Sequence, residues 1–504
     1  MADVRASSLP APVGGWDVLH AIADMPAQNA VRLDNWFCEP DSVETRGGYI
    51  SHVTGFVDTV DSLLAYRPPS GGDKLLAAAG DSIFDATTAG VVGTAVAVGF
   101  TAARWQYVQV TTSGGHFILA VNGADAPILY NGSVVTAAAI TGPTVANLAW
   151  INLHQSRVWT GERNSLVTWY LAPNAIGGAA VQFDLTSVAA MGGSITTMST
   201  WSRDGGAGAD DTAVFITSEG EALIYAGTDP SSAATWGLLG VFRIGRPLGR
   251  RCVVKFGADL CVFTEDGIVL LSQILPIDAS QRSAAAISNQ VNAAVTAAAR
   301  EYNSSFGWEP FLYPARNMAI FNVPTAYEAF DQYAFNTITR APSRFTGVPA
   351  RCWELIGGLP YFGSTASVCL FDSGSTDNGV AINAVAIQAP NAFGSRPQKK
   401  MFRRVQPILR VTGAPSFGVD IALDYRTFFA LPAVAASGLG GDFFWDNASW
   451  DSAIWLTDTI VIDEMRGVRG IGRTGAVRLV VDTDAAGRVS WVGTNVLYVP
   501  GGVL

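Results

Sequence analysis

A repeated hairpin pattern is the sequence feature that most constrains the fold of this chain. An apolar run, a short polar turn and a second apolar run recur many times, as in Ala213 to Pro230, which reads AVFITSEGEALIYAGTDP. Gly, Asp or Asn bounds each run, which is typical of a β-hairpin. Seven copies are marked by one residue in the first strand of each: Leu75, Phe117, Val158, Val214, Val262, Ala319 and Pro360.

The spacing of these copies favours a radial arrangement of small sheets. The markers lie 41 to 57 residues apart, with a mean of about 48, and a four-stranded propeller blade takes about 40–50 residues. A blade has two apolar faces that its neighbours must cover, and ring closure leaves only short edges. We therefore predict an all-β fold with a β-propeller of about six to eight blades. A β-sandwich with unrelated hairpins is the alternative.

Composition and charge narrow the class of protein. The chain has 504 residues, of which 49% are hydrophobic and 15% charged, so it can bury a large core. Its net charge of −10 argues against a grip on nucleic acid, although DNA could still pass such a surface. No apolar run approaches the roughly 18 residues of a membrane span, and the first residues lack an apolar signal core. We expect a soluble protein made in the cytoplasm.

The cysteines predict neither a disulfide framework nor a zinc site. Their number is odd, none stands in a C-x-x-C pair, and most have apolar neighbours. We expect small buried core residues at all five positions, which are Cys38, Cys252, Cys261, Cys352 and Cys369.

Three regions are predicted along the chain. Residues 1–60 form an N-terminal segment that joins the propeller, residues 61–390 form the propeller, and residues 391–504 form a smaller β-rich domain. One inserted amphipathic helix is expected near 284–301, where Ile287, Val291, Val295 and Ala298 recur at helical spacing. This helix could pack on the propeller rim or contact another subunit. The tryptophan-rich segment 443–455 could fill a small core or mark a binding surface.

Motifs for catalysis or cofactor binding are missing from the sequence. It contains no phosphate-binding loop, no dinucleotide fingerprint and no G-x-S-x-G elbow. The segment 202–206 matches only half of the turn motif of propeller sialidases, and 204–211 lacks the ligand pattern of a calcium loop. The four histidines, none at the spacing of a local zinc motif, are His20, His52, His116 and His154. We predict no enzyme, and no catalytic, cofactor-binding or metal-binding residues.

The segment Met25 to Phe56 carries a different signal. It places Asp34-Asn35-Trp36 ahead of Arg46-Gly47-Gly48-Tyr49. This order resembles the start of tail nozzle proteins of short-tailed bacteriophages, also called tail tubular protein B, and of the related phage stabilisation proteins. Later segments are similar as well, so the resemblance covers roughly residues 15–375.

The resemblance implies a structural virion protein. Members of that family are similar in being β-propeller proteins that form a hexameric tube below the portal and the adaptor, so we expect a homo-oligomer, an adaptor partner, tail fibres as further partners, and genomic DNA passing through the lumen. The expected location is the virion tail, assembled in the host cytoplasm.

Acidic loops at Glu219, Glu221, Glu265 and Asp266 are candidates for the lumen wall. A carbohydrate-binding or carbohydrate-active propeller is the alternative, and Trp105, Trp159 and Trp169 are expected in blade cores.

Overall fold

The computed structural model describes residues 4–204, 209–412, 415–426, 434–435, 460–483 and 487–503. The chain divides into two compact units. We call Ser51–Asp331 with Pro349–Leu370 the propeller unit, and Met1–Ile50 with Gln332–Val348 and Phe371–Leu504 the sandwich unit. This division differs from the predicted boundaries at 60 and 390, because the first 50 residues belong with the C-terminal strands and not with the propeller.

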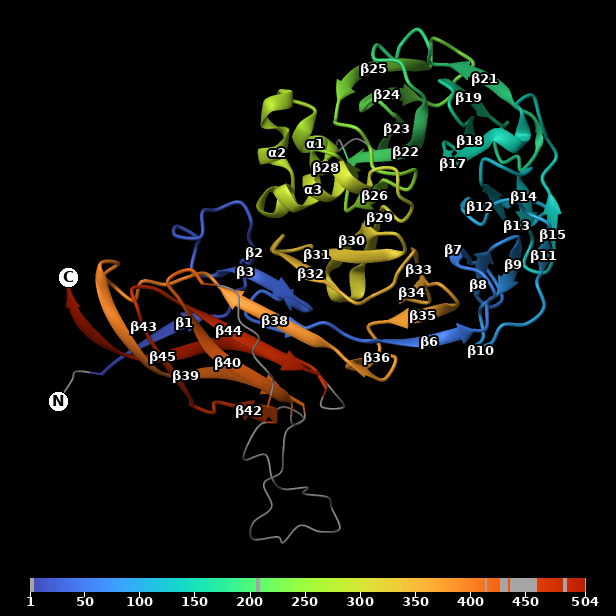
Figure 1. Ribbon diagram of the computed structural model, residues 1–504. Helices are drawn as coiled ribbons and strands as arrows, with labels where there is room; N and C mark the ends of the chain where they lie inside the picture. The colour runs from blue at the N-terminus through green and yellow to red at the C-terminus, as the bar shows by residue number, and fades with distance from the viewer. Residues whose placement is uncertain are drawn as a thin grey trace. The chain divides into compact units, whose positions relative to one another are not determined.

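Five small sheets of the propeller unit are separate antiparallel blades (Figure 1). Four have four strands and one has three. The all-β propeller arrangement is thus confirmed, but five separate blades are fewer than the predicted six to eight. The blades are β7 (Val60–Tyr66), β8 (Lys74–Ala79), β9 (Ser82–Asp85) and β11 (Ala97–Val98); β12 (Gln106–Thr112), β13 (Gly115–Val121), β14 (Ile128–Tyr130) and β15 (Val135–Ala137); β17 (Leu148–His154), β18 (Arg157–Glu162), β19 (Val167–Tyr170) and β21 (Val181–Asp184); β22 (Ile195–Asp204), β23 (Ala209–Thr217), β24 (Glu221–Gly227) and β25 (Trp236–Arg243); and β26 (Val253–Phe256), β27 (Asp259–Thr264) and β28 (Gly267–Leu270).

The count is lower because the last two hairpins belong to larger sheets. They are β29 (Glu309–Tyr313) with β30 (Met318–Ala326), and β33 (Cys352–Ile356) with β34 (Leu359–Gly363) and β35 (Ser367–Phe371). The first strands nevertheless contact one another in a closed circuit, in the order β7, β12, β17, β22, β26, β29, β33 and back to β7. Figure 1 shows β7, β12, β17 and β22 on the inner side of their sheets.

The repeated sequence pattern maps onto equivalent strands. Each of the seven markers lies in the second strand of its sheet, namely β8, β13, β18, β23, β27, β30 and β34. The next strand along the chain is the neighbour of that strand in every case. The prediction of one hairpin per copy is therefore confirmed.

Aromatic side chains fill the space between neighbouring blades. Trp159 is fully buried, stacks on Trp236 at 5.6 Å between ring centroids, and contacts the edge of Phe215 at 5.4 Å. Trp105 is also buried, as predicted, whereas Trp169 is only partly buried. All five cysteines are buried and free, which confirms their predicted role in the core.

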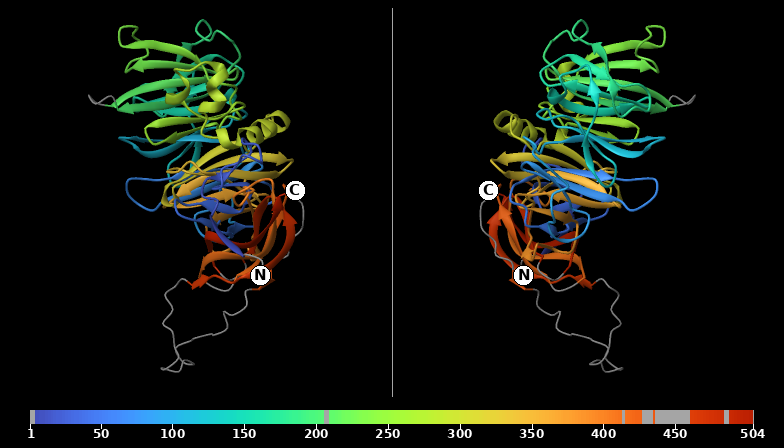
Figure 2. Two further views of the ribbon diagram at one scale, coloured as in Figure 1. Left: turned by 90° about the vertical axis from the view of Figure 1, so that its left-hand side faces the viewer. Right: turned by 90° about the vertical axis from the view of Figure 1, so that its right-hand side faces the viewer.

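The predicted single helix is wrong, because the segment is broken at Ser288. It contains α2 (Arg282–Ala285) and α3 (Asn292–Tyr302), and α1 (Leu271–Ile274) comes before them. The Ser288 hydroxyl accepts a hydrogen bond from the backbone N–H of Ile268 at 2.9 Å, which fixes the turn between α2 and α3. Helix α3 packs on β28 and β30 and lies beside them in Figure 1, and the helical segment is seen from two further sides, in yellow-green, in Figure 2. Among the described residues, every helix is too short or too polar to cross a membrane.

The sandwich unit contains two sheets, described strand by strand. The first has β1 (Arg5–Pro10), β4 (Trp36–Cys38), β5 (Val43–Thr45), β39 (Gln398–Val411), β42 (Ile460–Ile462), β43 (Arg466–Gly472) and β45 (Val489–Val503). The second has β2 (Gly15–Trp16), β3 (Asn29–Asp34), β38 (Asn383–Gln388), β44 (Gly475–Asp482), β40 (Ser416–Leu423) and β41 (Val434–Ala435), with β32 (Pro342–Phe345) beside β3.

The two sheets of this unit pack face to face through alternating apolar residues. Phe402, Val405 and Leu409 of β39 are fully buried, and β40 contacts both β39 and β43. A Cβ atom on Gly475 would come within 2.9 Å of the Phe402 ring, so the sheets approach closely there. The strand-rich reading of the C-terminal region agrees with these sheets, while the tryptophan-rich segment 443–455 lies outside the described residues.

His154, at the end of β17, is held neutral by burial. Its Nδ1 atom lies 3.0 Å from the Thr200 hydroxyl, and its ring packs edge-on against Trp236. Its Nε2 atom is buried without a hydrogen-bond partner in the described part of the chain. Desolvation lowers the pKa of His154 to about 4.

This histidine makes the stability of the protein sensitive to acid. In the unfolded chain His154 takes up a proton near its ordinary pKa of 6.5, whereas the folded protein resists protonation down to about pH 4. The contribution of neutral His154 to the free energy of unfolding is therefore fully present above pH 6.5. It is lost as the pH drops toward 4, by up to about 1.4 kcal/mol per pH unit. We expect His154→Gln to remove this part of the acid dependence in urea unfolding followed from pH 7.5 to 4. The control His52→Gln should keep the wild-type slope, and an unchanged slope in His154→Gln would contradict the assignment.

Candidate functional site

Two adjoining cavities lie where the first strands of the propeller unit meet. The larger one, about 240 Å³, is the central cavity. Its wall takes residues from all seven first strands, including Leu63, Tyr107, Asn152, Met198, Val253, Pro310 and Glu354. The smaller one, about 170 Å³, is the side cavity, lined by Arg104, residues 249–251 and residues 303–309. Both cavities share Gln106, Arg250, Arg251 and Glu309.

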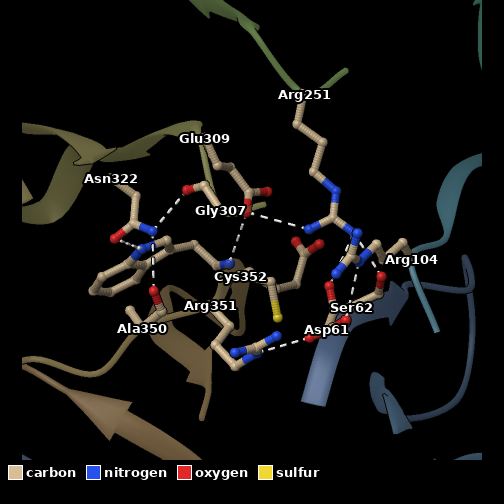
Figure 3. Close-up of polar contacts among 12 residues, drawn as sticks. Asp61, Ser62, Arg104, Arg251, Gly307, Glu309, Asn322, Ala350, Arg351 and Cys352 are labelled. Atoms are coloured by element: carbon tan, nitrogen blue, oxygen red, sulfur yellow. Dashed lines mark hydrogen bonds and ion pairs between the residues drawn. The ribbon is translucent and has the colours of Figure 1, made fainter. Parts of the chain in front are cut away.

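The Arg251 guanidinium connects several first strands at this point (Figure 3). Its Nη2 atom donates to the carbonyl oxygens of Asp61 (3.2 Å) and Trp105 (2.9 Å) and to the Ser62 hydroxyl (2.5 Å). Its Nη1 atom lies 3.3 Å from a carboxylate oxygen of Glu309. Burial alone would lower the pKa of Arg251, but the adjacent carboxylates, Glu309 foremost, outweigh it and raise that pKa. This cation therefore stays charged inside the unit.

The Asp61 carboxylate holds two further arginines. Arg351 Nε donates to one of its oxygens at 2.7 Å, and Arg104 Nε donates to the other at 3.1 Å. The Arg351 side chain is almost completely buried, whereas that of Arg104 is half exposed. Figure 3 shows both guanidinium groups converging on Asp61.

The aromatic ring of Phe306 makes cation–π contacts with three of these arginines. The Phe306 centroid lies 4.3 Å from the guanidinium carbon of Arg104, and 5.7 Å from those of Arg251 and Arg351. Each distance is within the range of a cation–π contact. The residues 303–307 next to the side cavity are therefore fixed by electrostatic attraction as well as by packing.

Two largely buried glutamates line the central cavity. Glu309 accepts a hydrogen bond from the backbone N–H of Trp353 (3.3 Å), and Glu354 accepts one from the Tyr107 hydroxyl (2.7 Å) and pairs with Arg67 (3.0 Å). Desolvation raises the pKa of both carboxyl groups. The arrangement places two carboxyl groups on the wall of the central cavity, each of them paired with an arginine.

Sequence reasoning did not nominate any of these residues. Glu309 and Glu354 stand 45 positions apart, and only the return of the chain around the propeller brings them together. Adjacent arginines are a weak signal for such a site, because Arg403-Arg404 also precede an apolar run, as Arg250-Arg251 do.

The four histidines lie apart from one another. His20 contacts Asp17 in the sandwich unit, while His52, His116 and His154 contact Thr87, Thr111 and Thr200. In the described ranges no three His, Cys, Asp or Glu residues are placed to hold a metal ion. Much of the acidic, glycine-rich segment 204–211 lies outside the described residues.

One of the predicted lumen residues is misassigned. Glu221 is only 2% exposed, and its carboxylate accepts a hydrogen bond from the backbone N–H of Met191 at 3.0 Å. It therefore braces a turn and cannot present its charge to a lumen. Glu219 and Asp266 are accessible, but they pair with Arg246 (2.7 Å) and Arg282 (3.7 Å).

Two of the residues that carry the family resemblance, Asn35 and Arg46, meet in one buried network of the sandwich unit. Arg46 Nε donates to the Asn35 side-chain oxygen at 2.9 Å, and its two terminal nitrogens bind the Asp377 carboxylate at 2.8 and 2.5 Å. The Arg46 side chain is fully buried. Asn35 has φ of 61°, a conformation that asparagine tolerates better than most residues. This explains the need for Asn and Arg at these two positions.

Gly48 lies close to the backbone of Thr376, the residue before Asp377. A Cβ atom at this position would lie 1.9 Å from the carbonyl oxygen of Thr376, so no larger residue fits without a shift of the backbone. Trp36 is also fully buried and contacts Trp491, with 6.0 Å between ring centroids.

No family model and no curated protein matches this chain. Solved structures with similar shape include BBS1N in complex with ARL6DN (10% identity, TM-score 0.39, covering 68% of this chain and 94% of that one). The extracellular domain of a putative hybrid two-component system of B. thetaiotaomicron has 9% identity and a TM-score of 0.41, covering 64% and 40%. The WD40 β-propeller domain of Doa1 has 12% identity and a TM-score of 0.37, covering 64% and 97%.

We expect Gly48→Ala to destabilise the protein by about 2 kcal/mol or more, because the added methyl group meets backbone atoms that cannot rotate away. Gly467→Ala is the matched control, since a Cβ atom on Gly467 meets nothing within 4 Å. Urea unfolding of both variants measures the difference. Equal stability of the two would contradict the close approach.

We expect Arg251→Met to cost about 3–5 kcal/mol, because it leaves the buried Glu309 carboxylate without its cation. The double variant Arg251→Met/Glu309→Leu should recover part of this loss, since neither buried charge remains. The exposed Arg163→Met serves as the control and should change the free energy of unfolding by less than about 0.5 kcal/mol. A loss in Arg251→Met no larger than in this control would refute the role of Arg251.

Proposed function

We propose that this protein is a structural subunit of the tail nozzle of a short-tailed bacteriophage. Copies of it would form a ring-shaped conduit, a homohexamer, that retains and then releases genomic DNA. The observation that carries the proposal is the buried network of Asn35 and Arg46, together with the close backbone approach at Gly48. The resemblance rests in part on these three residues. The fold uses the side chains of Asn35 and Arg46 in a buried hydrogen bond, and it leaves no room for a side chain at Gly48.

A free sheet edge supports association between copies. Strand β25 is the last strand of its blade, and in the described chain only β24 pairs with it. The strand pairing skips Leu239, which is 63% exposed, and Leu238 and Val241 are exposed as well. An apolar edge strand of this length favours contact with another protein surface. We assign this edge to the contact between neighbouring subunits of the ring.

The propeller of each subunit has seven positions in this proposal. The hairpins of β29–β30 and β33–β35 would act as the sixth and seventh blades beside the five separate ones, since their first strands take part in the closed circuit. A closed propeller is stiff because every blade is packed on both faces. A stiff subunit suits the wall of a conduit, whose function depends on keeping its shape.

The remaining parts of the proposal concern partners and location. The ring would dock on the tail adaptor protein and could carry tail fibres, with DNA passing transiently through the lumen. The net charge of −10 suits a wall that repels DNA and does not retain it. The protein would act in the virion tail after assembly in the host cytoplasm, and no enzymatic step is required.

A second candidate function is carbohydrate binding or hydrolysis. It is favoured by the central cavity, where Glu309 and Glu354 lie near the aromatic side chains of Tyr107 and Trp353. Paired carboxylates are the machinery of glycoside hydrolysis. Both carboxylates are bound by arginines, however, which favours a structural role for them. Binding on a glycan array by a monomeric protein would support this candidate.

The ring proposal is tested by mass measurement and electron microscopy of the purified protein, alone and with a portal–adaptor complex. We expect rings or short tubes that extend the portal axis. Leu239→Lys should abolish self-association, because it places a charge on the β25 edge. Val91→Lys is the control, since Val91 is 82% exposed but lies away from this edge on β10 (Gly90–Val91), and it should assemble normally.

Two outcomes would count against the ring. Monomers of the wild-type protein in both samples would remove the nozzle proposal and direct attention to the glycan array. Intact rings of Leu239→Lys would leave the nozzle standing but remove β25 from the subunit contact.

A further inference from the structure

The side cavity carries an excess of positive charge that the propeller does not neutralise. Three arginines line it, namely Arg104, Arg250 and Arg251, whereas Glu309 is the acidic residue of that wall. Asp61, outside the wall, is shared between Arg104 and Arg351. Glu309 is already bound by Arg251 and by a backbone N–H, so its charge is compensated.

The positive charge of Arg250 is the one that these carboxylates do not balance. Its guanidinium donates to the carbonyl oxygens of Asn122 (3.1 Å), Ala149 (3.0 Å) and Arg104 (3.5 Å). Within the described chain no carboxylate pairs with it. Burial and the neighbouring cations Arg251 and Arg104 lower its pKa to about 10, so it is still a cation at neutral pH. Carbonyl oxygens orient this group but do not balance its charge.

Gln106 provides a second, independent observation. This residue belongs to the walls of both cavities, and its Nε2 atom is buried without a hydrogen-bond partner among the described residues. A buried N–H donor that lacks an acceptor costs about 1–3 kcal/mol. An acceptor from outside the chain would satisfy it. The neutral donor of Gln106 and the uncompensated cation of Arg250 belong to the same wall. Together they would bind a negatively charged ligand whose oxygen atoms accept hydrogen bonds.

We propose that the side cavity binds a phosphate group, held by Arg250 and Arg251 with Gln106 as a neutral donor. Guanidinium groups match the oxygens of phosphate in charge and geometry. The central cavity adjoins this site and is lined by Asn152, Thr197 and Ser199, so it has polar room for an organic part attached to the phosphate. Free inorganic phosphate and a sugar phosphate share the recognising chemistry. The site goes beyond the ring function and does not depend on it.

The test is isothermal titration calorimetry of the full chain with inorganic phosphate and, separately, with glucose 6-phosphate, at constant ionic strength. We expect saturable binding at one site per chain. Arg250→Gln should weaken binding about tenfold or more, because it removes a charged donor. Since Arg250 also bridges strands, Gln106→Leu is the decisive variant: it should weaken binding by about fivefold or more without lowering the melting temperature in the absence of phosphate.

Matched controls separate a site from a general salt effect. Arg163→Gln makes the same change of charge on an exposed loop, and Gln182→Leu makes the same change of side chain on the exposed strand β21. Both should bind like the wild type. Tighter binding of glucose 6-phosphate than of phosphate would identify the central cavity as part of the site, and equal binding would identify free phosphate as the ligand. No saturable heat with either probe, or equal weakening in the controls, would overturn the proposal, whatever the outcome of the ring experiment.

Discussion

Among the described residues, each first strand of the propeller unit pairs with one neighbouring strand, and this leaves its inner edge to be satisfied by side chains. A β-strand at a sheet edge carries unpaired N–H and C=O groups, and burying such groups without partners is costly. Arg251 donates to the carbonyl oxygens of Asp61 on β7 and of Trp105 immediately before β12. Arg250 donates to the carbonyl oxygens of Ala149 on β17 and of Asn122 immediately after β13. The closed circuit of strands therefore depends on buried guanidinium groups that reach from one blade to the next.

This dependence explains why the center of the unit is polar while the spaces between blades are apolar. Between blades, flat aromatic and aliphatic faces meet, as Trp159 and Trp236 do, and non-directional packing is sufficient. At the meeting point of the first strands, the groups to be covered are directional carbonyl oxygens. Long planar donors fit them well, and Asp61 and Glu309 then balance the charge that those donors bring. The same solution leaves Arg250 without a counter-charge, which makes the center suited to a ligand.

The sequence predicts the periodic part of this architecture and little of its center. The hairpins were predictable because strand alternation and turn residues are local signals, and all seven markers lie on equivalent strands. The broken helix was not, since the hydrogen bond from Ile268 to Ser288 joins residues 20 positions apart. Glu221 looked like a solvated turn residue, but Met191, 30 positions away, binds its carboxylate. The network of Arg251, Asp61 and Glu309 joins residues up to 248 positions apart, beyond the reach of any local pattern.

The pairing of β1 with β45 has a consequence for how the chain is made. Ser8 and Asn495, which are 487 positions apart, share a hydrogen bond in this pair, and β4 and β5 join the same sheet. During synthesis, the early strands of the sandwich emerge long before their partners, whereas each propeller hairpin meets its partner within a few residues. Contacts of such high sequence separation form slowly. A chain that ends before residue 489 therefore lacks β45, with which β1 and β5 both pair, and it exposes strand edges that the complete sheet covers.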